Sequence, residues 1–468
     1  MMRTIISKAD ALLESKIVLW TMVIIGSCVY GLLCFGKTIW LDEALTGSFI
    51  RMGWWELICF TATDVHPPLY YLIVKLGITL FGDKIYIVKM FSYVPFVFTL
   101  LLTAVKVRRL FGEKTAFVLM ALLCTTPCII DRNVEMRMYQ WALFFVFAFA
   151  LYLFDVVKNN SGRARVICLF WGLCAAYTHY YALIAVAILY TILFFVYIKE
   201  KNIVYAIIRN AVASVIGYLP WLVVFLNQAK SLKETGWWQE ASLGVKDVYE
   251  YIVWPFRDNT GYEPILFFLL LIFVVFTALR KKTKNRMEIL SGIGAYIFFI
   301  VGGLLIILFY QPVFVTRFIY PIVGVLLLGL ALMAAQWRTE AICVLCAFIL
   351  LFGAKTYNSQ LHYQFNKDSI PALMNFMETI EKENAVILCD QDSVKCIVEY
   401  LYPNYFVKNS TEVEQSAVEG KDVYYLVCNP VSVEENGLSD LGLNKYELVD
   451  NVYVQYHSFD IYLARSER

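Results

Sequence analysis

The chain has 468 residues, of which 60% are hydrophobic and only 17% are charged, and its mean hydropathy is +0.63. A water-soluble globule of this length is less apolar, so the composition excludes that class and indicates an integral membrane protein. The formal net charge is only +2. We therefore expect the lipid bilayer, and no nucleic acid, as a partner.

Residues 17–35 form the first apolar run. They follow a basic flank, "MMRTIISKADALLESK", and the run is long enough to cross a bilayer. No small-residue cleavage site follows it, so the pattern predicts an uncleaved signal-anchor helix.

The later basic residues form short clusters between apolar runs, and such clusters mark cytoplasmic ends of membrane spans. They lie at 106–114, 158–165, 199–202, 280–286 and 336–338. With the amino terminus in the cytoplasm, residues 36–84 are then expected outside. The further spans are predicted near 85–105, 115–130, 139–157, 166–178, 181–198, 203–226, 263–279, 287–309, 318–335 and 341–354. The expected fold is an α-helical multi-pass bundle of about eleven transmembrane helices in the cell membrane.

Residues 67–81 are predicted to form a helix that lies on the outer surface of the bilayer. Leu69, Leu72, Ile73, Leu76 and Leu80 follow a helical period and form one apolar stripe. The two prolines at 67 and 68 suit a helix start. A transmembrane helix here would put the basic cluster at 106–114 outside, so we favour a surface helix.

The composition changes at the tail, which divides the chain into a membrane domain (1–354) and a small extracytoplasmic α/β domain (355–468). Residues 385–390, 422–429 and 453–464 are predicted as strands, and 393–401 as a helix. The tail shows no glycine-rich phosphate loop and no catalytic cluster, so we expect it to act in packing, gating or acceptor docking.

Nine of the twelve cysteines precede residue 350 and lie mostly in apolar runs, where a thiol behaves as a small hydrophobe. Cys343 and Cys346 have CxxC spacing, but no second pair or histidine accompanies them, which argues against a metal or redox site. Whether Cys389, Cys396 and Cys428 form a disulfide is left open.

Polar side chains collect on the predicted outer face in five separate stretches. These are "WLDEALT" with Asp42 and Glu43, "TDVHPPLYY" with Asp64, His66 and Tyr70, "DRNVEMRMYQ" with Asp131, Arg132, Glu135, Arg137 and Tyr139, "THYY" with His179 and Tyr180, and "TRFIYP" with Arg317. Each has an ordinary structural explanation. Acids cap helices, a histidine before prolines suits a turn, arginines pair with acids or snorkel, and tyrosines form interfacial belts.

The convergence of all five stretches on one face favours a reaction chamber instead. Carboxylates can accept a proton, arginines can hold a phosphate by bidentate hydrogen bonds, and aromatic rings can cover a sugar or lipid. The combination predicts a transferase whose leaving group is a phosphate.

The motifs "LDEA", "HPPLYY", "VEMRMYQ", "THYY" and "RFIYP" resemble, in order and approximate spacing, the C-type (GT-C) glycosyltransferase superfamily. The resemblance covers about residues 10–335 and is to bacterial proteins similar to the protein O-mannosyltransferase and lipid A aminoarabinose transferase families, that is, glycosyltransferase family 39-like. It implies an enzyme that takes a monosaccharide from a polyprenyl-phosphate donor and passes it to an extracytoplasmic lipid, glycan or protein acceptor.

The resemblance also implies roles for individual residues. Asp42 matches the first-loop aspartate that acts as general base, and Glu43 is its acidic neighbour. The donor phosphate is expected to contact His66, Arg137, Tyr139, His179, Tyr180 and Arg317, with Asp64, Tyr70 and Glu135 in the same cavity.

Some features depart from related families. The tail has no "WWDYG"-type motif, which argues against an oligosaccharyltransferase. The chain also lacks the long β-rich insertion of the eukaryotic protein mannosyltransferases, so that indication of a protein acceptor is absent. Asp42, Glu43, Asp64, His66 and His179 are metal-ligand types without ligand spacing, so the sequence leaves a divalent metal open. Two other classes remain as alternatives, namely a polyprenyl-lipid or polysaccharide transporter and an inactive sensor. The nearly charge-free interiors of the predicted spans argue against a transporter.

Overall fold

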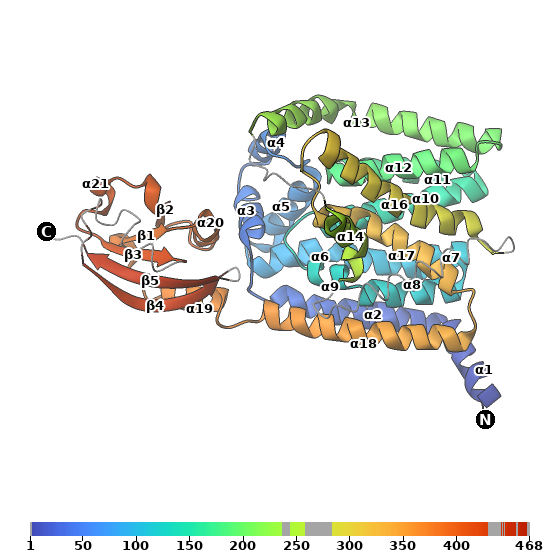
Figure 1. The fold of residues 1–468 in the computed structure, drawn as a ribbon, viewed down its shortest axis with the longest axis horizontal. Coiled ribbons are helices and arrows are strands. Elements are labelled where there is room, and N and C mark those ends of the chain that lie inside the picture. Colours follow the sequence, from blue (N-terminus) through green and yellow to red (C-terminus); the bar gives the residue numbers. More distant parts are fainter. Residues whose placement is uncertain are drawn as a thin grey trace.

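The computed structural model describes residues 2–235, 244–257, 283–428, 441, 443, 445–454 and 457–465. A bundle of helices occupies one side of the molecule, and a small α/β domain lies at one end of the bundle (Figure 1). The predicted span at 263–279 lies outside the described residues.

The helices of the bundle follow the predicted apolar runs. They are α1 (Met2–Leu13), α2 (Lys16–Leu32), α3 (Leu41–Phe49), α4 (Trp54–Thr63), α5 (Leu69–Phe81), α6 (Ile85–Leu102), α7 (Arg108–Phe111), α8 (Glu113–Thr125), α9 (Pro127–Arg132), α10 (Tyr139–Asn159), α11 (Gly162–Ala176), α12 (Tyr180–Val196), α13 (Lys201–Thr235), α14 (Val245–Val253), α16 (Arg286–Phe309), α17 (Tyr320–Ala334) and α18 (Thr339–Gln364).

Seven helical stretches among the described residues are long and apolar enough to cross a membrane. They are Lys16–Phe35, Ile85–Phe111, Tyr139–Asn159, Lys201–Leu232, Arg286–Phe309, Thr316–Ala334 and Thr339–Gln364. The predicted spans near 115–130, 166–178 and 181–198 correspond to the shorter helices α8, α11 and α12. The helical multi-pass fold is therefore confirmed, whereas the count of about eleven spans stays a prediction. The boundary expected at 354 falls inside α18.

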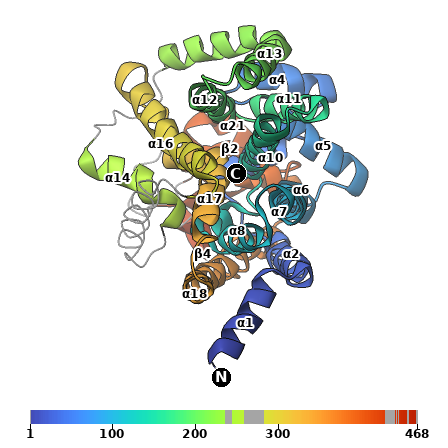
Figure 2. The ribbon, with the colours of Figure 1, turned by 90° about the vertical axis from the view of Figure 1, so that its right-hand side faces the viewer.

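Helices α10 and α17 form the centre of the bundle. In both spans 89% of the most apolar window is buried, against 33% for the spans that contain α2 and α18. Viewed along the bundle from the end that carries the amino terminus, α10 and α17 lie in the middle, with α2, α13 and α18 around them (Figure 2). A helix that is apolar all round suits such a central position.

The end of the bundle that carries the amino terminus also gathers basic loops. Lys114 Nζ lies 2.8 Å from Asp10 Oδ1, and Lys158 Nζ lies 3.1 Å from Glu288 Oε1. The α/β domain lies at the opposite end (Figure 1). This separation agrees with the predicted topology, in which the basic clusters face the cytoplasm.

The segment between α2 and α6 forms three short helices, α3, α4 and α5, next to the α/β domain (Figure 1). The predicted helix at 67–81 is present as α5. Its apolar stripe points outward, since Leu76 and Leu80 are 48% and 64% exposed, whereas Lys75 on another face is buried and donates to Ile50 O at 3.2 Å. An outward apolar stripe fits a helix whose surface meets lipid.

The α/β domain is built on a five-stranded sheet of order β2-β1-β3-β5-β4. Its elements are α19 (Ile370–Met377), β1 (Ala385–Cys389), α20 (Asp392–Leu401), β2 (Phe406–Asn409), α21 (Gln415–Val418), β3 (Asp422–Val427), β4 (Tyr446–Val454) and β5 (His457–Arg465). Strand β1 runs parallel to β2 and β3, and β5 runs antiparallel to β3 and β4. The three predicted strands and the helix at 393–401 are present, and β2 and β4 were not predicted.

The α/β domain shares a hydrophobic core with the bundle. Side chains alternate along β1, so Ile387 faces the core that continues into the bundle and Val386 faces a second, smaller core. The domain is therefore packed against the bundle and is not separated from it by a free linker.

A buried lysine ties the end of α18 to the segment before α3. Lys89 Nζ donates to Gly36 O at 2.9 Å, to Thr38 O at 2.8 Å and to Gln364 Oε1 at 2.5 Å. Thr38 Oγ1 also donates to Tyr363 O at 2.8 Å. These contacts fix the chain just before the helix that carries Asp42.

Candidate active site

Asp42 lies in the first turn of α3, between two arginines that come from distant parts of the chain. Its Oδ2 is 3.8 Å from Arg137 Nη2 and 3.7 Å from Arg317 Nη2. Arg137 Nη1 is also 3.3 Å from both Asp42 O and Thr46 Oγ1, which it faces as a donor. The structure thus brings together the predicted carboxylate and both predicted guanidinium groups.

Each arginine lies two or three residues before the start of a central helix. Arg137 ends the segment that leads into α10, and Arg317 lies in the short 3-10 turn Thr316–Ile319 that leads into α17. The Arg137 side chain is only 6% exposed, whereas that of Arg317 is 35% exposed and lies 5.4 Å above the ring of Trp40. The helices therefore fix the two cations at the end of the bundle where α3 lies.

Glu43 holds α3 to the segment that carries Arg137. Its Oε1 accepts from Met136 N at 2.8 Å and its Oε2 accepts from Trp40 N at 3.1 Å. Burial raises the pKa of Glu43 to about 7, although the charge of Lys89 and the two amides favour the ionised form. Both carboxylate oxygens are occupied, so Glu43 is placed to position its neighbours.

Glu135 has a similar bridging arrangement. Its Oε1 accepts from Trp40 Nε1 at 2.9 Å, and Arg132 Nη1 donates to both of its carboxylate oxygens, at 2.7 and 2.9 Å. Glu135 was expected in the cavity. In the structure its hydrogen bond to Trp40 orients the Trp40 ring that lies beneath Arg317.

Two histidines lie beside this cluster. His66 Nδ1 is 3.3 Å from Asp64 Oδ2, and the ring centroids of His66 and His179 are 5.8 Å apart. Burial lowers the pKa of His66, and nearby Arg137 lowers it further, so the ring is neutral at neutral pH. Burial acts to raise the pKa of Asp64, but the hydrogen bonds from His66 and from the Val65 amide, together with the charge of Arg137, bring it below the usual value.

The neutral state defines what these histidines offer to a ligand. With Nδ1 of His66 donating to Asp64, its Nε2 is an acceptor. His179 Nδ1 accepts from Tyr181 N at 3.2 Å, which leaves the proton on its Nε2 as a donor. His66 was expected to help neutralise a phosphate, but a neutral ring contributes hydrogen bonding and no charge.

Four polar atoms around Asp42 are buried without a hydrogen-bond partner in the described part of the chain. They are Arg137 Nε, Arg317 Nε and the hydroxyls of Tyr71 and Tyr139. Burying a polar group without a partner costs about 1–3 kcal/mol, so such atoms are rarely left without a hydrogen bond in a folded protein. Their presence at one place indicates a site that a polar ligand fills.

Tyr71 was missed in the sequence analysis, which selected its neighbour Tyr70. The hydroxyl of Tyr70 is hydrogen-bonded to Ser92 Oγ at 2.9 Å, and this contact faces α6 and not Asp42. Both tyrosines are fully buried, so no pattern of polarity distinguishes them in the sequence.

Tyr180 is also engaged away from Asp42. Its hydroxyl donates to Gln228 Oε1 and accepts from Trp221 Nε1 at 3.2 Å, and both partners lie on α13. Tyr139 does reach the cluster, since its ring centroid is 5.8 Å from that of His179.

No group of three or more His, Cys, Asp or Glu side chains within the described residues is arranged to hold a metal ion. The five residues considered as ligands in the sequence thus form no ligand set, because Asp42 faces arginines and Glu43 faces backbone amides. All twelve cysteines, each in a described range, are free thiols, including Cys389, Cys396 and Cys428.

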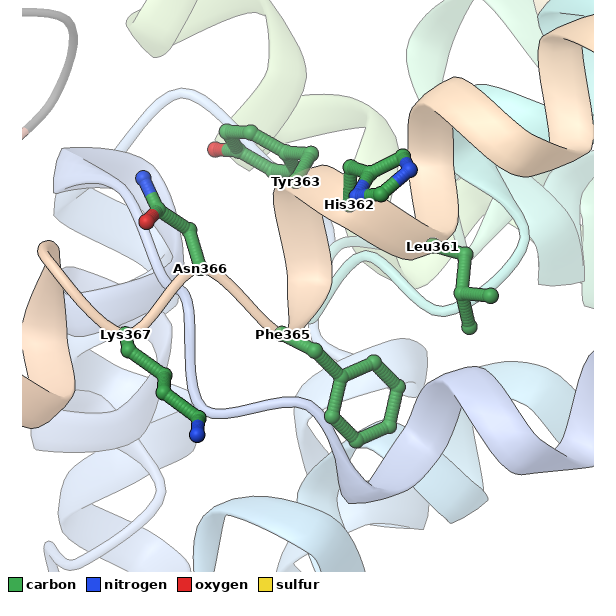
Figure 3. A pocket seen from close by; sticks show the side chains of 6 residues that line it. All are labelled: Leu361, His362, Tyr363, Phe365, Asn366 and Lys367. Carbon is green, nitrogen blue, oxygen red and sulfur yellow. The ribbon is translucent and has the colours of Figure 1, made fainter.

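A cavity of about 810 Å³ at the carboxyl end of α18 is lined by none of the predicted site residues (Figure 3). It is lined by Leu361, His362, Tyr363, Phe365, Asn366 and Lys367. These residues lead from α18 into the α/β domain, so the cavity marks the junction between the two parts of the chain.

Comparisons with known proteins agree with this architecture. The family model of dolichyl-phosphate-mannose-protein mannosyltransferases matches residues 65–225, a range that contains "HPPLYY", "VEMRMYQ" and "THYY" but neither Asp42 nor Arg317. No curated protein sequence matches significantly.

Two solved structures of ArnT from Cupriavidus metallidurans are similar to this chain. The apo structure has a TM-score of 0.66 at 10% identity and covers 96% of this chain and 98% of ArnT. The structure bound to undecaprenyl phosphate has a TM-score of 0.60 at 11% identity and covers 94% and 97%. The likeness shows that the chain has the fold of ArnT over nearly its whole length, and together with the family-model match it confirms the predicted resemblance.

Proposed function

We propose that this protein is a membrane glycosyltransferase that moves a monosaccharide from a polyprenyl-phosphate donor to an acceptor outside the cytoplasm. The observation that carries the proposal is the arrangement around Asp42. Two arginines reach within 3.8 Å of its carboxylate, and four polar atoms beside it are buried without partners among the described residues.

On the donor side, the unpartnered atoms match the chemistry of a phosphate. Arg137 and Arg317 offer Nε donors, and the hydroxyls of Tyr71 and Tyr139 offer two more. Guanidinium groups bind phosphate oxygens through charge-assisted hydrogen bonds, which are stronger than neutral ones. ArnT bound to undecaprenyl phosphate supports a lipid phosphate as the ligand of this fold.

On the acceptor side, Asp42 acts as general base. Its carboxylate takes the proton from an acceptor hydroxyl while that oxygen forms a bond to the anomeric carbon of the sugar. The bond from the anomeric carbon to the phosphate oxygen breaks, and polyprenyl phosphate leaves with the electron pair. A single displacement inverts the configuration at the anomeric carbon, and the two arginines stabilise the charge on the departing phosphate.

The histidines are placed to orient the sugar. His66 offers an acceptor nitrogen and His179 offers a donor nitrogen, with the Tyr139 ring 5.8 Å from that of His179. Neutral donors and acceptors of this kind match sugar hydroxyls, which both donate and accept. A transporter would place its ionisable groups within spans near the midplane, whereas these residues precede α5, α10, α12 and α17.

We also propose that the amino terminus faces the cytoplasm and that the α/β domain and the Asp42 site lie on the outer side. The basic clusters at the opposite end of the bundle support this orientation. An impermeant thiol reagent applied to cells tests it. A cysteine introduced at the exposed position 56 should be reachable from outside, whereas one at the exposed position 163 should be reachable only after the membrane is opened.

The proposed activity is tested with purified protein in detergent, a panel of polyprenyl-phosphate monosaccharides, and an extract of membrane lipids and wall glycans that supplies the acceptor hydroxyl. Release of polyprenyl phosphate, followed by mass spectrometry, is the readout. Asp42→Asn should abolish release while the protein stays folded. The matched control is Asp422→Asn, which changes an acid on β3 paired with Arg465 at 3.1 Å. Release at the parental rate by Asp42→Asn would show that this carboxylate is not the base.

A further inference from the structure

The α/β domain contacts the same helix that carries Asp42. Helix α20 gives α3 its most extensive helix contact among the described elements, and it lies between the sheet and α3 (Figure 1). On its other side, α3 faces Arg137 through Asp42 and Thr46. Helix α3 is therefore held between the bundle and the α/β domain.

The contact is centred on Gly47 and Tyr400. Gly47 is buried within α3, and a Cβ atom added to it would lie 2.3 Å from Cε2 of the Tyr400 ring. Tyr400, near the end of α20, is itself only 2% exposed. The ring thus rests directly on the backbone of α3, and only glycine leaves room for it.

Glycine is an unfavourable choice for the interior of a helix, since alanine stabilises a helix better. Its presence in the nine-residue helix α3 is explained by the close approach of Tyr400. The low helix propensity of Gly47 is therefore offset by the contact that it allows with the α/β domain.

Arg51 holds Tyr400 against Gly47 through two contacts. It follows α3, its Nη1 donates to Tyr400 O at 2.7 Å, and its guanidinium lies 4.5 Å above the Tyr400 ring. Its Nε lies 2.6 Å from Asp83 Oδ2, in the loop between α5 and α6. Tyr400 is one of the last residues of α20, where carbonyl groups lack helical partners and cations are favoured.

We propose that the α/β domain is a positioning element for Asp42. Tyr400, seated on Gly47 and held by Arg51, fixes the place of α3 and thereby the distance from Asp42 to the reacting atoms. The domain controls the rate of transfer without contacting the substrate. This inference rests on the proposed function for its kinetic part only, because the position of α3 is also measurable without any activity.

The test is a double-mutant cycle of Gly47→Ala and Tyr400→Ala. Misplacing a catalytic group by about 1 Å costs on the order of 10²-fold in rate. Gly47→Ala in the parent should lower kcat at least about tenfold, with KM for the donor changed less than about twofold, because both arginines belong to other elements. In the Tyr400→Ala background the ring is gone, so Gly47→Ala should change kcat less than about twofold.

Hydrogen exchange of the backbone amides gives the second readout. Gly47→Ala should speed exchange in peptides covering 41–49 and 392–401 and leave α10 and α17 unchanged. The control is Gly302→Ala in α16, where an added Cβ meets no heavy atom of the described residues within 4 Å. This variant should match the parent in both readouts.

Two results would overturn the inference. One is an equal effect of Gly47→Ala in both backgrounds, and the other is unchanged exchange in residues 41–49. Should the parent protein transfer no sugar from any donor, the proposed function fails, and the exchange measurement still decides whether Tyr400 positions α3.

Discussion

Replacing Arg137 by alanine removes a guanidinium that is only 6% exposed and lies 3.8 Å from the Asp42 carboxylate. Hydrogen bonds to charged groups contribute about 1.5–3 kcal/mol when they are buried. Since about 1.4 kcal/mol corresponds to a factor of ten, the affinity for polyprenyl phosphate should fall between about tenfold and a hundredfold. Arg317 is 35% exposed, so solvent screens it more and Arg317→Ala should cost less.

Arg137→Lys separates charge from geometry. Lysine keeps the positive charge but lacks the planar guanidinium, whose several N–H donors can face Asp42 O and Thr46 Oγ1 and bind a ligand at the same time. The affinity of Arg137→Lys for polyprenyl phosphate should therefore lie between those of the parent and of Arg137→Ala. Titration of the purified protein with polyprenyl phosphate in detergent measures the dissociation constant directly.

The control for this series is Arg165→Ala, which removes a half-buried arginine that is hydrogen-bonded to Asn160 in the loop between α10 and α11. Its dissociation constant should equal that of the parent. If neither Arg137→Ala nor Arg317→Ala weakened binding, the phosphate would have to bind elsewhere, and the reasoning from unpartnered donors would be wrong.

Three further predictions follow from the contacts around Asp42. Tyr71→Phe removes a buried hydroxyl that has no partner among the described residues, so transfer should fall about tenfold while the stability of the ligand-free protein stays equal or rises. Tyr70→Phe should lower stability by about 1 kcal/mol through its lost bond to Ser92 and leave transfer intact, and the opposite pattern would exchange their roles. Glu43→Gln replaces one accepting oxygen by an amide and leaves a buried N–H unpaired, so unfolding should be easier by about 1–3 kcal/mol, and an unchanged midpoint would contradict the bridging role. The pKa of His66 is lowered in the folded protein, so the unfolded chain protonates first and stability should fall as the pH drops below about 6.5; thermal unfolding at pH 5.5 and 7.5 should show a smaller difference in His66→Gln, and an equal difference would exclude this contribution.

The sequence predicted the elements that depend on composition and period. Apolar runs gave the membrane helices, and the prolines at 67 and 68 marked the start of α5. The strands β1, β3 and β5 were recognised because they are rich in buried β-branched and aromatic residues. Strand β4 was missed because its first six residues are exposed and carry no apolar alternation.

The site was predicted at the level of charge and not at the level of contacts. Asp42, Arg137 and Arg317 could be grouped because arginines and acids are costly to bury and stand out in an apolar chain. The different contacts of Asp42, which faces two arginines, and Glu43, which faces two backbone amides, could not be foreseen, since they depend on how the chain folds around each residue. Gly47 carries no chemistry, so its role emerges only when the Tyr400 ring is seen above it.

The starts of α10 and α17, which lie two and three residues after Arg137 and Arg317, add a second source of attraction for an anion. Each helix carries a partial positive charge of about half an elementary charge at its amino end, spread over amide groups that no side-chain substitution removes. A protein lacking both arginines should therefore keep a weak residual affinity for anions. The two central helices, which make up the most buried part of the bundle, therefore contribute a positive electrostatic potential at the Asp42 site as well as rigidity.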